Sequence, residues 1–156
     1  MLKRLYGHEL PFPQDLVLLQ HGDICNADSL KNGLPKFVIY YDNGICSPCA
    51  VNRIMEYYHM FQFFQKKGIY PMILLGTATD DQYRAVVGIL RARRYPIPVY
   101  IDRNDIYSNK KSLVPSDRRY HSWLLDADNR IVLVGNPSNN KRLMSLYDSV
   151  INRLAD

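Results

Sequence analysis

The sequence has little of what marks disulfide scaffolds, membrane proteins or repeat proteins. It contains only 3 cysteines in 156 residues, too few for a small domain stapled by disulfides. No window approaches the ~18–20 consecutive apolar residues of a membrane-spanning helix, and the start, Met1-Leu2-Lys3-Arg4, carries no apolar signal core. Internal repeats and low-complexity tracts are absent. With 47% hydrophobic residues, the chain is predicted to form one domain over residues 1–156.

The chain also lacks a large excess of charge of one sign. The chain has 20 Lys and Arg against 15 Asp and Glu, a formal net charge of +5. Basic residues gather between Arg84 and Arg119, but Asp102, Asp105 and Asp117 lie among them, and no aromatic stacking platform is interleaved. The run is therefore predicted to be a solvated face, and no nucleic-acid partner is expected. Binding to nucleic acid or an anionic surface stays a third alternative, which would show a steep salt dependence.

Strand and helix patterns alternate from residue 36 onward. Residues 1–35, punctuated by glycine and proline, are predicted to form an N-terminal hairpin extension with short strands near 16–20 and 24–26. The core, 36–156, has the order β-α-β-α-β and then β-β-α, which predicts an α/β three-layer sandwich with a mixed central sheet. The predicted core elements are strands at 37–41, 70–75, 99–102, 122–125 and 130–134, helices at 48–67, 79–94 and 139–154, and a short helix or turn at 105–112.

The first core helix begins with proline and has an apolar face. Pro48 suits the first helical turn, where a missing N–H does no harm. Lys66, Lys67 and Gly68 are typical of a helix end. The apolar residues at helical spacing, predicted to face inward, are Val51, Ile54, Met55, Tyr58, Phe61 and Phe64.

Two cysteines lie between the first core strand and this helix, in Cys46-Ser47-Pro48-Cys49. A C-x-x-C spacing after a strand in a βαβ pattern is typical of a redox dithiol. A helix N-terminus is expected to lower the pKa of the Cys46 thiol toward about 7, and Cys49 is close enough to resolve a mixed disulfide. Two alternatives stay open: a zinc site, although no second cysteine pair or closely spaced histidine pair completes it, and two structural cysteines in a turn. No metal and no cofactor is predicted.

From Lys36 to the C-terminus the sequence resembles thioredoxin-fold thiol-disulfide oxidoreductases, especially extracytoplasmic thioredoxin-like proteins of Gram-negative anaerobic bacteria. The resemblance rests on two motifs. One is strand 37–41 leading into Gly44-Ile45-Cys46-Ser47-Pro48-Cys49. The other is residues 122–137, which are similar to the hairpin "F-L-L-D-x-D-x-x-I-V-x-x-G-x-P" of those proteins. The resemblance implies a thioredoxin-like α/β/α fold, with Cys46 as the nucleophilic thiol, Cys49 as the resolving thiol, and Ile45, Ser47 and Pro48 as their neighbours.

Three positions depart from that family. Ile45 stands where a tryptophan usually precedes the first cysteine, and Tyr40 stands where a buried carboxylate assists proton transfer. Tyr120 or His121 occupies the place of a cis-proline that faces the dithiol, and Pro115 comes about five residues too early unless a loop brings it back. Tyr120 and His121 are thus candidates for an active-site loop, in which His121 could accept a proton.

Two related enzyme classes can be compared with this chain by their characteristic residues. Peroxiredoxins carry a threonine three residues before the reactive cysteine and a proline four before that threonine, where this chain has Asn43 and Ile39. That peroxidase chemistry is not predicted. Glutathione-dependent relatives share the fold and stay open, although no distinct set of glutathione-binding residues is visible.

The predicted function is disulfide exchange with protein substrates and a redox partner protein, serving cell redox homeostasis without a cofactor. The alternative is a thioredoxin-like binding module with weak or no redox catalysis. The resemblance implies a periplasmic or extracytoplasmic location, with membrane contact only through a lost leader or lipid anchor. The third cysteine, Cys25, is expected to be a small buried hydrophobe, or else a regulatory or intermolecular thiol.

Overall fold

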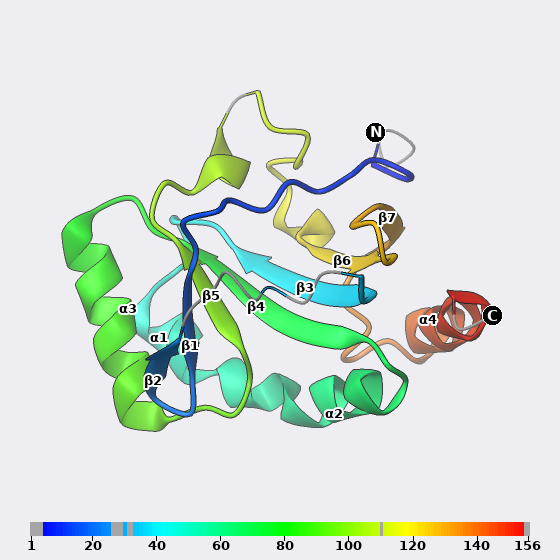
Figure 1. Cartoon of the computed structure of the whole chain (residues 1–156), viewed down its shortest axis with the longest axis horizontal. Helices are drawn as coiled ribbons and strands as arrows, with labels where there is room; N and C mark the ends of the chain where they lie inside the picture. Colours follow the sequence, from blue (N-terminus) through cyan, green and yellow to red (C-terminus); the bar gives the residue numbers. More distant parts are fainter. Residues whose placement is uncertain (1–4, 26–29, 31–32, 110, 155–156) are drawn as a thin grey trace.

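A computed structural model describes residues 5–25, 30, 33–109 and 111–154. Seven strands form one sheet in the order β2-β1-β5-β4-β3-β6-β7 (Figure 1). Strands β3, β4 and β5 are parallel, while β1 runs antiparallel to β2 and β5, and β6 runs antiparallel to β3 and β7. The predicted mixed sheet is confirmed. The strands are β1 (Val17–Gln20), β2 (Asp23–Cys25), β3 (Lys36–Tyr41), β4 (Tyr70–Gly76), β5 (Val99–Asp102), β6 (Ser122–Leu125) and β7 (Ile131–Val134).

The two faces of the sheet are covered differently. Successive residues of β3 point to opposite faces, so that Phe37 and Ile39 join the core under the α-helices and Val38 and Tyr40 join the other core. Residues 5–16, the short 3-10 helix at 106–108 and residues 113–114 pack against this second face (Figure 1). The helices are α1 (Pro48–Asn52), η3 (Ile54–Tyr57), α2 (Tyr58–Lys66), α3 (Asp80–Arg93), η4 (Ile106–Ser108), η5 (Arg118–Tyr120) and α4 (Lys141–Leu154).

The helix predicted over 48–67 is broken into α1, η3 and α2, and Met55, predicted to face inward, is 39% exposed. A 3-10 helix turns by about 120° per residue and an α-helix by about 100°, so the four residues of η3 add about 80° of rotation. This extra rotation brings Phe64 to the same side as Val51 and Ile54, and all three side chains are fully buried. An unbroken α-helix would spread these side chains over a wider arc.

The predicted N-terminal hairpin is confirmed as β1 and β2, at the edge of the sheet beside β5. Positive φ angles at His21 and Gly22 form the two-residue turn between them. Asn26, included in the predicted second strand, lies outside the described residues. No helix in the described part of the chain is long and apolar enough to cross a membrane.

Candidate dithiol site

The two cysteines lie just beyond the C-terminal end of β3. The Asp42 carbonyl accepts hydrogen bonds from the backbone N–H of Ile45 at 3.1 Å and of Cys46 at 2.9 Å, which closes the turn after the strand. Ser47 then caps α1, its Oγ accepting from the N–H of Ala50 at 3.2 Å, and Pro48 takes the first helical position as predicted. Cys46 therefore precedes the cap, and Cys49 lies in the first turn of α1.

Gln82 of α3 holds this loop from the side. Its Nε2 donates to the carbonyl oxygens of Asn43 at 2.8 Å and Cys46 at 2.7 Å, while its Oε1 accepts from the N–H of Ala78 at 2.7 Å. Thr79 caps α3, since its Oγ1 accepts from the Gln82 N–H at 3.1 Å. The spacing from Thr79 to Gln82 is that of a capping box, but Gln82 Oε1 bonds the N–H of Ala78 rather than that of Thr79. The same glutamine side chain thus starts a helix and fixes the cysteine loop, a second role that its sequence position does not reveal.

The thiols differ sharply in accessibility. All three cysteines lie within the described residues and carry free thiols; Cys46 is only 4% exposed, whereas Cys49 is exposed. Burial, followed by the charges of Asp105 and Asp42, raises the pKa of the Cys46 thiol to about 12. The expectation that this pKa is lowered is wrong, because loss of hydration and two nearby carboxylates act against the thiolate.

Tyr40 stands where the resembling family has a buried carboxylate, and a carboxylate from a segment far along the chain bonds to it. Asp105, 5% exposed and just before η4, accepts a hydrogen bond from the hydroxyl of Tyr40. It also accepts from Asn43, through the backbone N at 2.9 Å and through Nδ2 at 2.7 Å, and from Ser108 Oγ at 2.8 Å. Burial, and then the hydrogen bond to Asp105, raises the pKa of Tyr40 well above its ordinary range. A buried carboxylate therefore acts on Cys46 after all.

The loop predicted around Tyr120 and His121 reaches the same turn. His121 directly precedes β6, its carbonyl accepts from the N–H of Tyr40 at 2.8 Å, and its side chain is buried. The ring Nε2 lies 2.7 Å from the carbonyl oxygen of Pro115, so that nitrogen carries the proton. The loop thus brings the Pro115 carbonyl beside the side chain of His121, the residue that precedes β6. The half-buried Tyr120 instead lies beside Arg119, whose guanidinium is 5.6 Å from its ring centroid.

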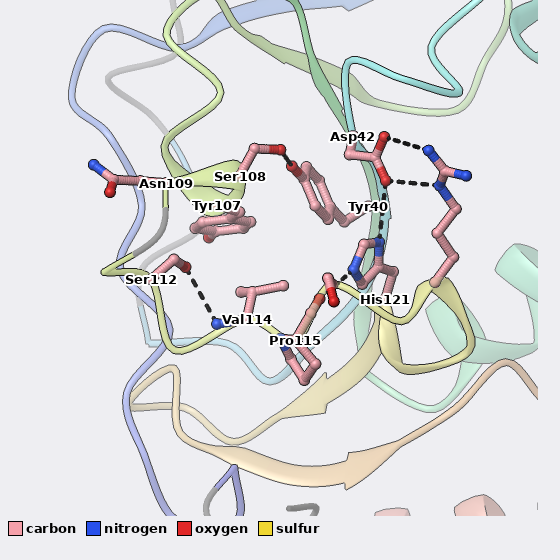
Figure 2. Close-up of a pocket in the computed structure, with 11 residues that line it drawn as sticks. Tyr40, Asp42, Tyr107, Ser108, Asn109, Ser112, Val114, Pro115 and His121 are labelled. Atoms are coloured by element: carbon pink, nitrogen blue, oxygen red, sulfur yellow. Dashed lines mark hydrogen bonds and ion pairs between the residues drawn. The ribbon is translucent and has the colours of Figure 1, made fainter.

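An ion pair links this loop to the turn. Arg118 donates to the Asp42 carboxylate from Nε at 2.8 Å and from Nη2 at 3.0 Å, and these bonds hold the pKa of Asp42 below its usual value. The other ring nitrogen of His121, Nδ1, lies 3.8 Å from Asp42 Oδ2. Figure 2 shows these side chains around a cavity of about 510 Å³. The lining residues are Tyr40, Asp42, Tyr107, Ser108, Asn109, Ser112, Val114, Pro115, Ser116, Arg118 and His121.

Within the described ranges, no three His, Cys, Asp or Glu side chains gather closely enough to hold a metal ion. Cys25 lies far from the dithiol in sequence and is exposed on β2, so the prediction of a buried residue is wrong. The reason is its place: β2 is an edge strand whose three residues are all exposed.

Comparison with known proteins gives a clear result only at the level of structure. No protein-family model and no curated protein matches the sequence. A protein described as a thiol-disulfide oxidoreductase from Bacteroides vulgatus matches with a TM-score of 0.61, at 18% identity over 95% of this chain and 98% of that one. The fold is thioredoxin-like.

Two further thioredoxin-like matches agree. A thiol:disulfide interchange protein from Bacteroides sp. has a TM-score of 0.53, at 12% identity over 94% of this chain and 90% of that one. AhpC from Enterococcus faecalis has a TM-score of 0.58, at 11% identity over 97% of this chain and 96% of that one. At identities this low, the structural similarity shows the fold alone, and function must be argued from the site.

Proposed function

We propose that this protein is a thiol-disulfide oxidoreductase that exchanges disulfides with protein substrates through the Cys46 and Cys49 dithiol. The observation that carries the proposal is the pair of free cysteines separated by two residues in a thioredoxin-like fold, with Cys46 in the turn after β3 and Cys49 in the first turn of α1. Solved structures with this fold include proteins described as thiol-disulfide oxidoreductases. The proposed partners are protein thiols or disulfides and a redox partner protein, and the proposed location, supported by the resemblance, is extracytoplasmic.

The chemistry needs only the two thiols. As a reductant, the dithiol gives two electrons and two protons to a partner disulfide, ending as a Cys46–Cys49 disulfide while the partner gains two thiols. As an oxidant, the reverse exchange takes place. No organic cofactor enters the proposal.

The test is the reduction potential of the pair, measured in glutathione buffers by mass spectrometric counting of free thiols. Cys25→Ser serves as the background, so that only the pair is counted, and Cys46→Ser on that background is the control. A reversible two-electron transition between about −300 and −100 mV is expected. A pair that never forms a disulfide, or that cannot be reduced in the folded protein, would refute the proposal.

One observation favours a second candidate, a thioredoxin-like binding module with weak or no redox catalysis. The Cys46 thiol is buried beside two carboxylates, which keep it protonated. Reduction of insulin disulfides by dithiothreitol separates the two functions. An oxidoreductase accelerates this reaction over buffer, and a binding module does not.

A further inference from the structure

We infer that the two thiols have exchanged the roles that the resemblance implies: Cys49 attacks the partner disulfide, and Cys46 resolves the mixed disulfide. This inference rests on the proposed dithiol function. It concerns which sulfur a partner reaches first, and it is carried by the accessibility of the two side chains and by the bonds around Cys46.

Attack on a disulfide requires the sulfur to meet the partner's sulfur in line with the bond that breaks. Cys46 is 4% exposed and belongs to the core under the helices, which includes Val51 and Ile54. With so little of this residue exposed, a partner polypeptide has to displace neighbouring side chains before it reaches the Cys46 sulfur. Cys49 is exposed in the first turn of α1, next to the exposed Pro48, and a partner can approach it without displacing the core.

Cys46 is also fixed in its buried position. Its backbone N–H donates to the Asp42 carbonyl at 2.9 Å, and its own carbonyl accepts from Gln82 Nε2 at 2.7 Å. Moving this residue outward would break both bonds and expose apolar surface. Cys49 is exposed and does not belong to the core under the helices, so the easier motion during exchange is that of the first turn of α1.

The surroundings of Cys46 suit a thiol that acts second. Burial and the carboxylates of Asp105 and Asp42 keep it protonated while the protein waits for a partner. A first-attacking thiol needs the opposite: exposure and a ready thiolate.

The exchange balances as follows. The Cys49 thiolate attacks one sulfur of the partner disulfide, that S–S bond breaks, and the released partner thiolate takes a proton from water. Cys46 then gives its proton to water, and its thiolate attacks the Cys49 sulfur. The mixed disulfide breaks, and the second partner sulfur leaves as a thiolate and is protonated. The dithiol has then lost two electrons and become the Cys46–Cys49 disulfide, and the partner disulfide has been reduced to two thiols.

The experiment compares Cys46→Ser and Cys49→Ser, each in the Cys25→Ser background, because Cys25 is exposed and would react as well. Ellman's reagent measures the rate at which the remaining thiol attacks a small disulfide, and insulin serves as the protein disulfide for trapping. The Cys46→Ser variant should react at least about ten-fold faster than the Cys49→Ser variant. It should also form a lasting mixed disulfide with insulin through Cys49. In urea the two rates should become similar, because only the fold buries Cys46.

A Cys49→Ser variant that reacts as fast as Cys46→Ser in the folded state, or that traps insulin instead, would overturn the inference. The measured potential separates this failure from failure of the proposed function. A normal two-electron transition together with trapping through Cys46 would leave a redox enzyme whose thiols keep the roles expected from the resemblance. Absence of any transition would refute both.

Discussion

Removal of the Asp105 charge should make the buried thiol more acidic. The pKa of Cys46 stands at about 12 against an ordinary 9.0, a difference worth about 4 kcal/mol between its protonated and ionised forms. Burial is the largest cause and persists in Asp105→Asn, and Asp105 is the stronger of the two charges. We expect the substitution to lower the Cys46 pKa by about one unit, or about 1.4 kcal/mol. At pH 9 the thiolate fraction would then rise about ten-fold.

The assay is the pH dependence of iodoacetamide alkylation in a Cys25→Ser, Cys49→Ser background, in which Cys46 is the only thiol. Asp128→Asn is the matched control, because Asp128 is an exposed carboxylate whose charge does not act on Cys46. Asp105→Asn should also lower the free energy of unfolding by roughly 2 kcal/mol, since the donors of Tyr40 and Asn43 lose part of their acceptor. A folded Asp105→Asn protein with the parent's pH–rate profile would refute the electrostatic reasoning.

Three further outcomes are expected. The free energy of unfolding, measured in urea, should be highest below about pH 9 and fall above it, because Cys46 and the buried tyrosines release protons more readily in the unfolded state. Equal stability at pH 8 and pH 11 would contradict this. Gly76→Ala should cost roughly 1–3 kcal/mol, because its Cβ would lie 2.2 Å from the Asp105 carboxyl, whereas Gly88→Ala, in open space on α3, should gain up to about 1 kcal/mol in the same thermal unfolding assay. Gln82→Glu would set a carboxylate against two carbonyl oxygens, costing roughly 1–3 kcal/mol and raising the alkylation rate of Cys46; an unchanged rate would show that this contact does not hold the loop.

The sequence predicts the parts of this fold that depend on local pattern. Strands β3 to β7, the N-terminal hairpin and the start of α3 follow from apolar runs, turn residues and short spacings, and all are present. The break at η3 was missed because the helical apolar spacing continues through it, and only the burial of Phe64 shows the need for extra rotation.

The candidate site was predicted only in part, because its charges come together through tertiary structure. The cysteines and His121 follow from spacing and resemblance, but Asp105 lies 62 residues from Asn43, which it bonds. A signal was available at Tyr40: a hydroxyl in the middle of a buried strand requires a partner, and a carboxylate elsewhere in the chain is a natural one. The burial of Cys46 has no comparable sign in the sequence.

The extended N-terminal segment closes the second face of the sheet, and this has a consequence for the order of folding. Leu5 and Leu10 are buried there, and the segment pairs with the far end of the chain, Gly7 donating to the Ile131 carbonyl at 2.8 Å and Leu10 to the Asn129 carbonyl at 2.8 Å. Gly7 and Leu10 can therefore make these bonds only after more than a hundred later residues have been synthesised. Such distant pairing slows folding, and until it forms the nascent chain carries an uncovered apolar sheet face that a chaperone would recognise.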